Sequence, residues 1–207
     1  MKTLKIFVLL LITTCANAQK ADKSIYVNPK VGINLSGLND DLDGISNSGK
    51  AGYNIGLDLR LGDGIIFFQP GAYYYQYHTQ YTIVESNLLP DGRTTYETDI
   101  KVESIKIPAQ LGIRIITTDL LGVRANLGPA LNFPVKVNSE DDFALKRGNY
   151  KNVNVGGVIG AGVDLAFFSF DLNYEFGLSD YVEFKNPNVE TSSSKQYVLS
   201  FNVGINF

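Results

Sequence analysis

From residue 26 onwards, the chain repeatedly alternates apolar residues with small or polar ones. This is the period of a β-strand that has one apolar face. Residues 51–61 are the clearest case, because every odd position is apolar and every even position is glycine, asparagine, aspartate or arginine. The same alternation fills the last stretch, 195–207, which ends on Phe207. The pattern predicts eight strands, at about residues 26–36, 51–61, 65–81, 102–115, 121–133, 153–165, 168–176 and 195–207.

The connections between these predicted strands alternate in length. Long polar segments follow the first, third, fifth and seventh strands, at about residues 37–49, 83–98, 136–151 and 179–194. Short ones follow the second, fourth and sixth strands, near residues 62–64, 117–120 and 166–167. An even strand number with alternating short turns and longer loops is typical of membrane barrels. We therefore predict an all-β fold, an eight-stranded antiparallel up-and-down transmembrane β-barrel, with both termini at the periplasmic, short-turn end.

Alternation alone leaves open which face is outside, because a soluble ligand-binding barrel would enclose the apolar face. Two features favour an apolar exterior. The apolar faces are long enough to cover a hydrocarbon core on tilted strands. The opposite face is rich in glycine, asparagine and serine, which suits the narrow interior of an eight-stranded barrel. We predict that Leu57, Leu127 and Phe201 face lipid.

The predicted inner face also carries charges of both signs. They must pair, because a lone buried charge costs several kcal/mol. We expect a structural ion-pair network that fills the lumen, with Asp171 and Glu175 paired to Arg60 or Arg124. A gated ion path or a proton relay is the alternative. The nine members are Lys30, Asp58, Arg60, Lys106, Arg114, Arg124, Asp164, Asp171 and Glu175.

Aromatic residues cluster near both ends of the predicted wall, where girdles at the membrane interfaces are expected. A ligand-binding aromatic patch is the alternative. The predicted outer girdle is Tyr73, Tyr74, Tyr75, Tyr77 and Tyr81, and the predicted inner one is Phe67, Phe68, Phe167 and Phe168. Prolines also fall within the predicted strands, where each lacks a ladder donor. We expect Pro29, Pro70, Pro108, Pro129 and Pro134 at bulges or rims.

The first 18 residues have the features of a secretion signal: a basic start, a short apolar core and an Ala-x-Ala site. Cleavage is predicted between Ala18 and Gln19, which leaves 19–207 as one barrel domain. A retained anchor helix is the alternative. The one cysteine, Cys15, lies inside the signal, so the mature chain would have no thiol. Lipidation of Cys15 would be a second alternative, but Thr14 is larger than the residue that usually precedes such a site.

Charge and motif content narrow the function further. Removal of Lys2 and Lys5 with the signal leaves 16 basic and 21 acidic residues, a net charge of about −5, which argues against nucleic acid as a partner. We expect no metal at His78, the only histidine, because it lacks partner ligands. The acidic segments 39–44 and 140–142 match no complete calcium loop. No catalytic or cofactor-binding residue is predicted, since no nucleophile or phosphate-loop motif is recognisable.

Several short motifs, in their order along the chain, resemble the PorT-like outer-membrane β-barrel family of Bacteroidetes. They are Gln69-Pro70, Ile107-Pro108, Gly128-Pro129, residues 160–163, residues 174–180 and the Ala18-Gln19 junction. The resemblance covers nearly the whole mature chain and implies the barrel fold and the outer-membrane location. Gly71 departs from the pattern, because members often carry an acidic residue there. The resemblance transfers no site residues.

The expected function is that of a non-enzymatic outer-membrane protein of a Gram-negative bacterium. Its role would be structural, or would lie in binding an extracellular ligand through the long loops. The expected partners are outer-membrane lipid and the barrel-assembly machinery, the latter through the C-terminal strand, 195–207. A small channel or a transport- or secretion-associated component, a soluble periplasmic ligand-binding barrel and a barrel enzyme are the alternatives.

Overall fold

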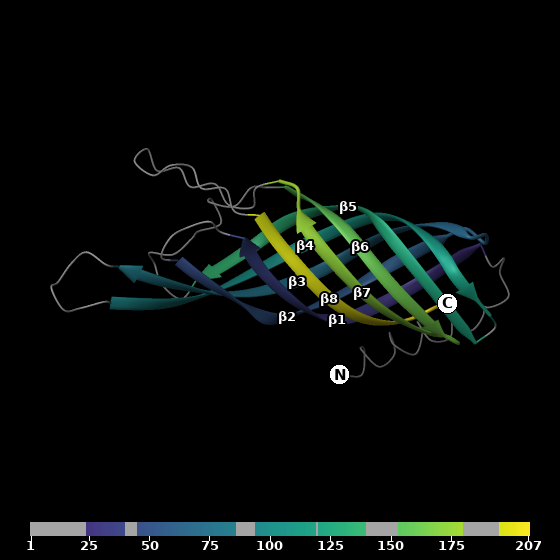
Figure 1. Ribbon diagram of the computed structural model, residues 1–207, viewed down its shortest axis with the longest axis horizontal. Helices are drawn as coiled ribbons and strands as arrows, with labels where there is room; N and C mark the ends of the chain where they lie inside the picture. Colours follow the sequence, from purple (N-terminus) through teal and green to yellow (C-terminus); the bar gives the residue numbers. More distant parts are fainter. Residues whose placement is uncertain (1–23, 40–44, 86–93, 119, 140–152, 180–194) are drawn as a thin grey trace, which may run out of the picture.

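A computed structural model describes residues 24–39, 45–85, 94–118, 120–139, 153–179 and 195–207. Its eight strands form a closed barrel, in which each strand is antiparallel to its neighbours and β8 closes onto β1 (Figure 1). This confirms the predicted fold. The predicted signal peptide and its cleavage site lie outside the described residues. The strands are β1 (Ile25–Asn39), β2 (Ile45–Leu61), β3 (Ile66–Glu85), β4 (Thr94–Thr117), β5 (Leu121–Ser139), β6 (Asn154–Leu165), β7 (Phe168–Gly177) and β8 (Lys195–Ile205).

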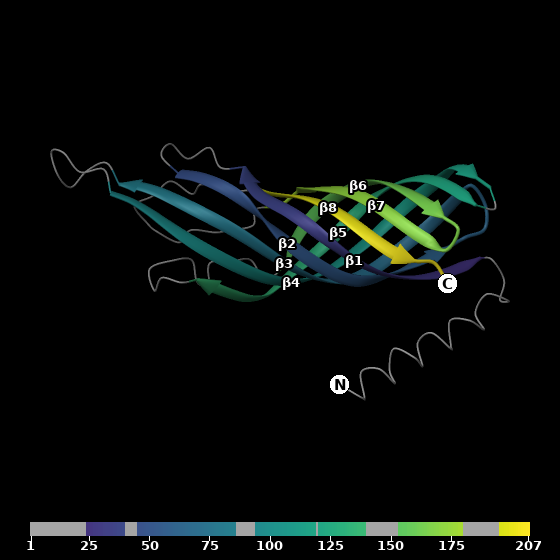
Figure 2. The ribbon, with the colours of Figure 1, turned by 90° about the horizontal axis from the view of Figure 1, so that it is seen from below.

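Three short turns lie at one end of the barrel. The start of β1 and the C-terminus of the chain lie at the same end (Figure 2). Two of the turns occupy residues 62–65 and 166–167, and the third connects Thr117 of β4 to Leu121 of β5. The backbone of Val27 exchanges two hydrogen bonds with Phe207, at 3.0 and 3.1 Å, which ties the two chain ends together. Gly62 has a φ of 120°, a conformation that glycine adopts without steric cost. The described part of the chain holds no helix long and apolar enough to cross a membrane.

Five strands extend three or more residues further from the turns than the sequence pattern predicted. Residues 37–39, 45–50, 83–85, 94–98 and 136–139 belong to strands, although the pattern predicts polar loops there. The β3–β4 ladder continues as far as the pair Glu85 and Thr94. Apolar residues such as Ile45 and Val137 are scattered in these segments, so no sustained apolar face marks them in the sequence although they pair as strands. The barrel is therefore lopsided, because β2 to β5 project beyond the other four (Figure 1).

The apolar face points outward, as predicted. Leu57, Leu127 and Phe201 are exposed, Leu127 to 65%, whereas Arg60 is 4% exposed and Glu175 is buried. The pattern holds around the wall, because register partners such as Leu127 and Ile159 present their side chains to the same face. A soluble barrel with an apolar interior is therefore ruled out. So continuous an apolar exterior is typical of a barrel wall that contacts membrane lipid.

The aromatic side chains correct the girdle prediction. Tyr73, Tyr75, Tyr77 and Phe67 are buried inside the barrel, so they belong to neither girdle. They fill space that glycines leave, because a Cβ at Gly56 would overlap the ring of Tyr73 and one at Gly112 would overlap Phe67. Tyr74 stays on the outer wall, as do Phe68, Phe167 and Phe168. The side chain of Tyr81 lies outside the described residues.

The prolines are accommodated differently from the prediction. Pro134 lies beside a register shift between β4 and β5, as expected of a bulge. By contrast, Pro29 pairs with Leu57 and Pro129 with Gly157 in uninterrupted ladders. Pro70 and Pro108 likewise keep the register of their strands. The prediction of bulges is therefore wrong for these four prolines.

Candidate functional site

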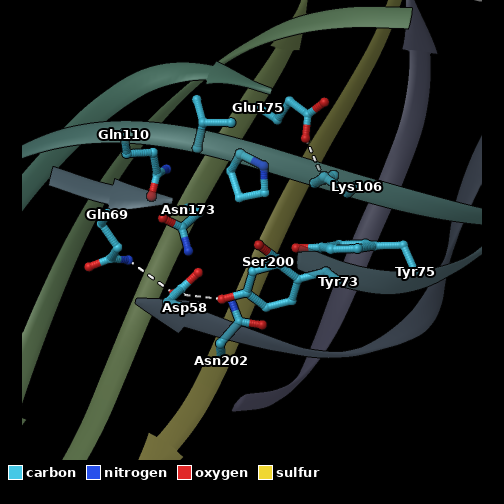
Figure 3. Close-up of a pocket in the computed structure, with 12 residues that line it drawn as sticks. Asp58, Gln69, Tyr73, Tyr75, Lys106, Gln110, Asn173, Glu175, Ser200 and Asn202 are labelled. Carbon is cyan, nitrogen blue, oxygen red and sulfur yellow. Dashed lines mark hydrogen bonds and ion pairs between the residues drawn. The ribbon is translucent and has the colours of Figure 1, made fainter. Parts of the chain in front are cut away.

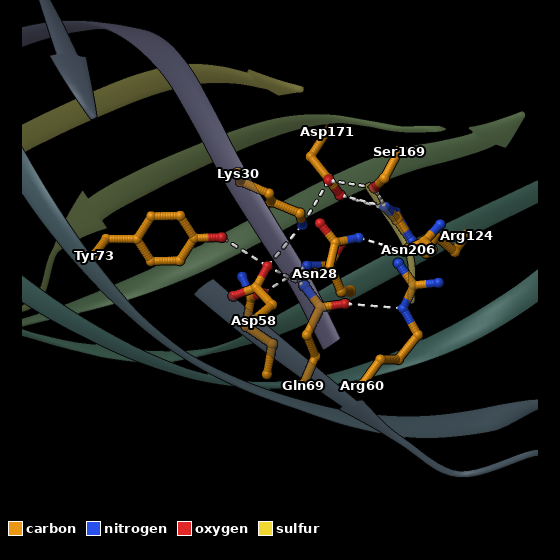
Figure 4. Close-up of polar contacts among 12 residues, drawn as sticks. Asn28, Lys30, Asp58, Arg60, Gln69, Tyr73, Arg124, Ser169, Asp171 and Asn206 are labelled. Carbon is orange, nitrogen blue, oxygen red and sulfur yellow. Dashed lines mark hydrogen bonds and ion pairs between the residues drawn. The ribbon is translucent and has the colours of Figure 1, made fainter. Parts of the chain in front are cut away.

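The lumen of the described barrel holds many buried polar and charged side chains. Lys30 lies at the centre of the charged ones. Lys30 of β1 reaches across the interior to Asp58 of β2 and Asp171 of β7, with Nζ 2.6 Å from an oxygen of each carboxylate (Figure 4). All three side chains are almost completely buried. The single cation thus holds two carboxylates from opposite flanks of β1.

Two arginines extend these contacts toward the short-turn end. Arg124 of β5 donates to Asp171 at 2.8 Å and lies 3.3 Å from Asp164 of β6. Arg60 of β2 contacts the same Asp164 at 2.9 Å. The result is a chain of alternating charges, which we call the lower network: Asp58, Lys30, Asp171, Arg124, Asp164 and Arg60. With three carboxylates and three cations, the lower network has no net charge.

Neutral polar side chains form hydrogen bonds with the charged groups of the lower network. The Tyr73 hydroxyl and the Gln69 amide both donate to Asp58, at 2.7 and 3.0 Å (Figure 4). Asn206 donates to Asp164 at 3.1 Å, and Ser169 accepts from Arg124 at 2.7 Å. Charge-assisted hydrogen bonds of this kind are stronger than neutral ones. The network is therefore fixed from several strands at once.

A glycine next to the lower network makes room for one of its arginine side chains. Gly162 on β6 faces Arg124 on β5, its register partner. A Cβ at position 162 would overlap the Arg124 guanidinium. Because Gly162 has no side chain, the Arg124 guanidinium can lie against the neighbouring strand β6, within reach of both Asp164 and Asp171.

A second ion pair lies further toward the long-connection end. Lys106 of β4 contacts Glu175 of β7, and its Nζ lies 3.8 Å from the centre of the Tyr75 ring. Asn132 donates a hydrogen bond to the same carboxylate. Both charged side chains are nearly completely buried. This upper pair is again neutral, and the cation–π contact adds to its stability.

A small cavity separates the lower network from the upper pair. Asp58 and Tyr73 line it from one side, and Lys106 and Glu175 from the other (Figure 3). Its volume is about 30 Å³, enough for about one water molecule. The lumen at this level is therefore filled by side chains rather than by an aqueous channel.

The structure brings together eight of the nine charged residues that the sequence singled out. Arg114 differs, because its guanidinium donates to the carbonyl oxygens of Gly62 and Gly64 in a turn. Asp171 does meet Arg124, as expected, but Glu175 meets Lys106 instead of an arginine. Glu175 lies four positions after Asp171, about 13 Å along a strand. That distance places Glu175 closer to the long-connection end, beside Lys106.

The sequence analysis missed the neutral partners of the network. Tyr73 was predicted in the outer girdle, and nothing in the sequence marked Gln69 as a partner of Asp58. The available signal was the alternation along the strand, because Gln69 and Tyr73 share a face with the small residue Gly71. Ser169 and Asn206 carry the same signal on β7 and just after β8.

His78, which was considered for metal binding, belongs to neither of the two ion-pair groups. The His78 ring contacts Gln76 at 2.9 Å and the carbonyl oxygen of Ala51 at 3.3 Å. Within the part of the chain that the structure describes, no three histidine, cysteine or acidic residues are grouped to hold a metal ion. Residues 40–44 and 140–142 of the two acidic segments lie outside that part, so their relation to calcium remains a sequence-based expectation.

Comparison with known proteins agrees with this architecture. No curated protein sequence matches the chain. The outer membrane protein OprG from Pseudomonas aeruginosa is 12% identical over 89% of this chain and 96% of its own, with a TM-score of 0.51. Neisserial surface protein A is 15% identical over 88% and 97%, with a TM-score of 0.48. At these identities the likeness concerns the fold. Residues 17–183 match a family described as the outer membrane protein beta-barrel domain, and the chain belongs to that family.

Proposed function

We propose that this protein is a closed, non-enzymatic scaffold of the outer membrane, whose working surface is the long-connection end. The observation that carries the proposal is the filled lumen. Two neutral ion-pair groups cross the interior, and the cavity between them has a volume of only about 30 Å³. A solute would have to separate these pairs to pass.

The energetic barrier to such an opening is large. Breaking a buried pair and leaving one partner uncompensated costs about 3–5 kcal/mol. Lys30 and Arg124 each contact two carboxylates, so moving either one disturbs more than a single pair. The lower network therefore acts as a fixed plug and supports the structural role over a proton relay or a gate.

The lopsided shape supports binding at the long-connection end. β4 has 24 residues and β6 has 12, and a strand rises about 3.3 Å per residue. β2 to β5 therefore carry a sheet beyond the rest of the wall. Short turns are periplasmic and long loops extracellular in bacterial barrels, so this sheet would face the exterior and both termini the periplasm. An extracellular ligand would bind there, while outer-membrane lipid and, through β8, the barrel-assembly machinery are the remaining partners.

Membership of the PorT-like group of Bacteroidetes is the finer family assignment that we propose. The Gly71 departure fits the local packing, because a Cβ at this position would contact Asp58. An acidic side chain there would bring a second negative charge against that carboxylate. Glycine at position 71 thus leaves room for the Asp58 carboxylate, which belongs to the lower network.

Single-channel recording separates this proposal from a small channel or transport component. The purified protein in a planar phosphatidylcholine bilayer is expected to show no conductance steps, because ion-paired side chains fill the described part of the lumen. A sixteen-stranded porin, which has an open aqueous channel, serves as the positive control. Reproducible steps from the folded barrel would contradict the proposal and favour the channel.

A further inference from the structure

We infer that the projecting part of β2 is a docking edge for an extended polypeptide segment of another protein, which pairs with it as an additional strand. The inference rests on the proposed role of the long-connection end as the working surface, and it names how a partner binds there. Residues 45–50 of β2 pair with β3 in a continuous ladder. Among the described residues their other edge has no partner strand, because the β1–β2 ladder ends at the pair Leu35 and Ala51.

The end of β1 does not cover this edge. Beyond Leu35, β1 continues along β8 instead, from Ser36 opposite Val198 to Asn39 opposite Lys195. β1 and β2 therefore separate toward the long-connection end, and only β2 continues into the projecting sheet (Figure 1). A strand edge left in this way presents a row of backbone N–H and C=O groups without ladder partners.

The other edge of the projecting sheet is protected against pairing, whereas the β2 edge is not. That other edge belongs to β5, whose ladder with β6 ends at Asn132. Just beyond this point β5 carries Pro134, a register shift in its pairing with β4 and the exposed Lys136. Proline, bulges and lysine are features that keep a sheet edge from pairing with another chain. By contrast, residues 45–49 are Ile, Ser, Asn, Ser and Gly, with neither proline nor charge.

The free edge has the length of an ordinary strand. A register shift between Lys50 and Tyr53 limits it on the barrel side, which leaves residues 45–49. In an antiparallel pair every second residue exchanges both of its backbone hydrogen bonds with the partner, so this edge offers about four to six bonds. Only a polypeptide backbone repeats N–H and C=O groups at this spacing. The edge therefore fits an extended peptide of about five residues without proline, held mainly through its backbone.

A second copy of this chain does not fit the same edge. Strands of bacterial outer-membrane barrels tilt by about 35–45°. Where two upright barrels touch, their facing strands therefore cross at about 70–90°. Neighbouring strands of one sheet differ by only about 20–25°. A flexible segment of another protein can take up the direction of β2, which favours such a segment over a second barrel.

Amide hydrogen exchange in the folded protein tests the edge directly. The isotope-labelled barrel in phosphatidylcholine nanodiscs is measured with and without a synthetic peptide of alternating threonine and valine. Without peptide, the amides of residues 45–49 should alternate between slow exchange, where they bond to β3, and fast exchange, where they face the free edge. Saturating peptide should slow the fast set by at least about tenfold and leave residues 133–139 unchanged.

Two results of this exchange measurement would overturn the inference. The first is a fast set that stays fast at millimolar peptide. The second is an edge that is already protected without peptide, which would place another segment of this chain or a second copy there.

A blocking motif copied from β5 provides the matched variant. Ser46→Pro combined with Ser48→Lys gives β2 the proline and lysine that β5 carries at positions 134 and 136. This variant should bind a fluorescent form of the peptide at least about tenfold more weakly, which corresponds to the loss of one or two backbone hydrogen bonds. Lys136→Ser, on the other edge, is the control and should bind as the unchanged protein does. Circular dichroism verifies the β-structure of both variants.

Equal affinity of all three proteins, or a loss of affinity in Lys136→Ser, would place the peptide elsewhere and contradict the inference. Because conductance is measured separately, either result would leave the closed-scaffold proposal untouched.

Discussion

Replacing Lys30 by methionine is expected to lower the free energy of unfolding by about 3–5 kcal/mol. Lys30 lies 2.6 Å from both Asp58 and Asp171 in the lumen. Without the ammonium group, Asp58 has no cationic partner among the described residues, and Asp171 keeps only Arg124. Methionine preserves most of the side-chain volume, so the loss reports the uncompensated charge rather than a cavity.

Urea unfolding of the barrel in phosphatidylcholine vesicles measures this change, as a shift of the midpoint at constant slope. Lys195→Met is the matched control, because Lys195 is exposed at the start of β8. The control should change stability by no more than about 0.5 kcal/mol. Equal effects of the two substitutions would show that Lys30 contributes no more than a surface lysine.

Replacing Leu127 by arginine is expected to destabilise the barrel by about 2–4 kcal/mol, the cost of a cationic side chain at the bilayer midplane. Leu127 points outward and lies midway along the part of β5 that pairs with β6. The cost depends on depth and falls to about 0–1 kcal/mol near the interface. Leu165→Arg, at the short-turn end of β6, therefore serves as the shallow comparison.

The same vesicle unfolding assay measures both arginine variants. A larger loss for Leu127→Arg than for Leu165→Arg is expected, because only the first places the guanidinium far from water. Equal losses would mean that the two outward positions share one environment, which is incompatible with a bilayer spanning this wall.

The membrane-crossing part of the fold was predictable because its two faces differ in polarity. Along β6, β7 and β8 the apolar positions alternate with small or polar ones, except at the inward Val158 and Val198, and the observed bounds lie close to those predicted. The projecting parts of β2 to β5 were not predictable in this way. Their apolar residues, such as Ile45 and Val137, are scattered, so the sequence carries no continuous apolar period there.

Inward aromatic residues and pairing partners were harder to predict than the faces. In the segment from Tyr73 to Tyr77, aromatic residues occupy both faces, so composition alone suggested a girdle. Their placement depends on glycines of neighbouring strands, such as Gly56 beside Tyr73. Likewise, Glu175 pairs with Lys106 because of the position of β7 relative to β4. Such distances across the barrel depend on the tilt and stagger of the strands. The alternation of apolar and polar residues along the sequence does not specify either quantity.

The two neutral groups in the lumen explain how charges can be retained inside a narrow barrel. Each cation is offset by a carboxylate, so neither group requires a counter-ion from solvent. The side chains come from strands on opposite sides of the barrel, as Lys30 of β1 and Arg124 of β5 both reach Asp171 of β7. The network thus links the wall across its interior.

The most direct test of the account is a nitroxide scan along β8, from Leu199 to Val203, in lipid vesicles. Each residue in turn is replaced by cysteine and spin-labelled, and collisions with lipid-soluble oxygen are measured against those with a water-soluble nickel complex. The account predicts that oxygen contact is highest at Leu199, Phe201 and Val203 and lowest at Ser200 and Asn202. The opposite phase, or the absence of a period of two, would contradict it.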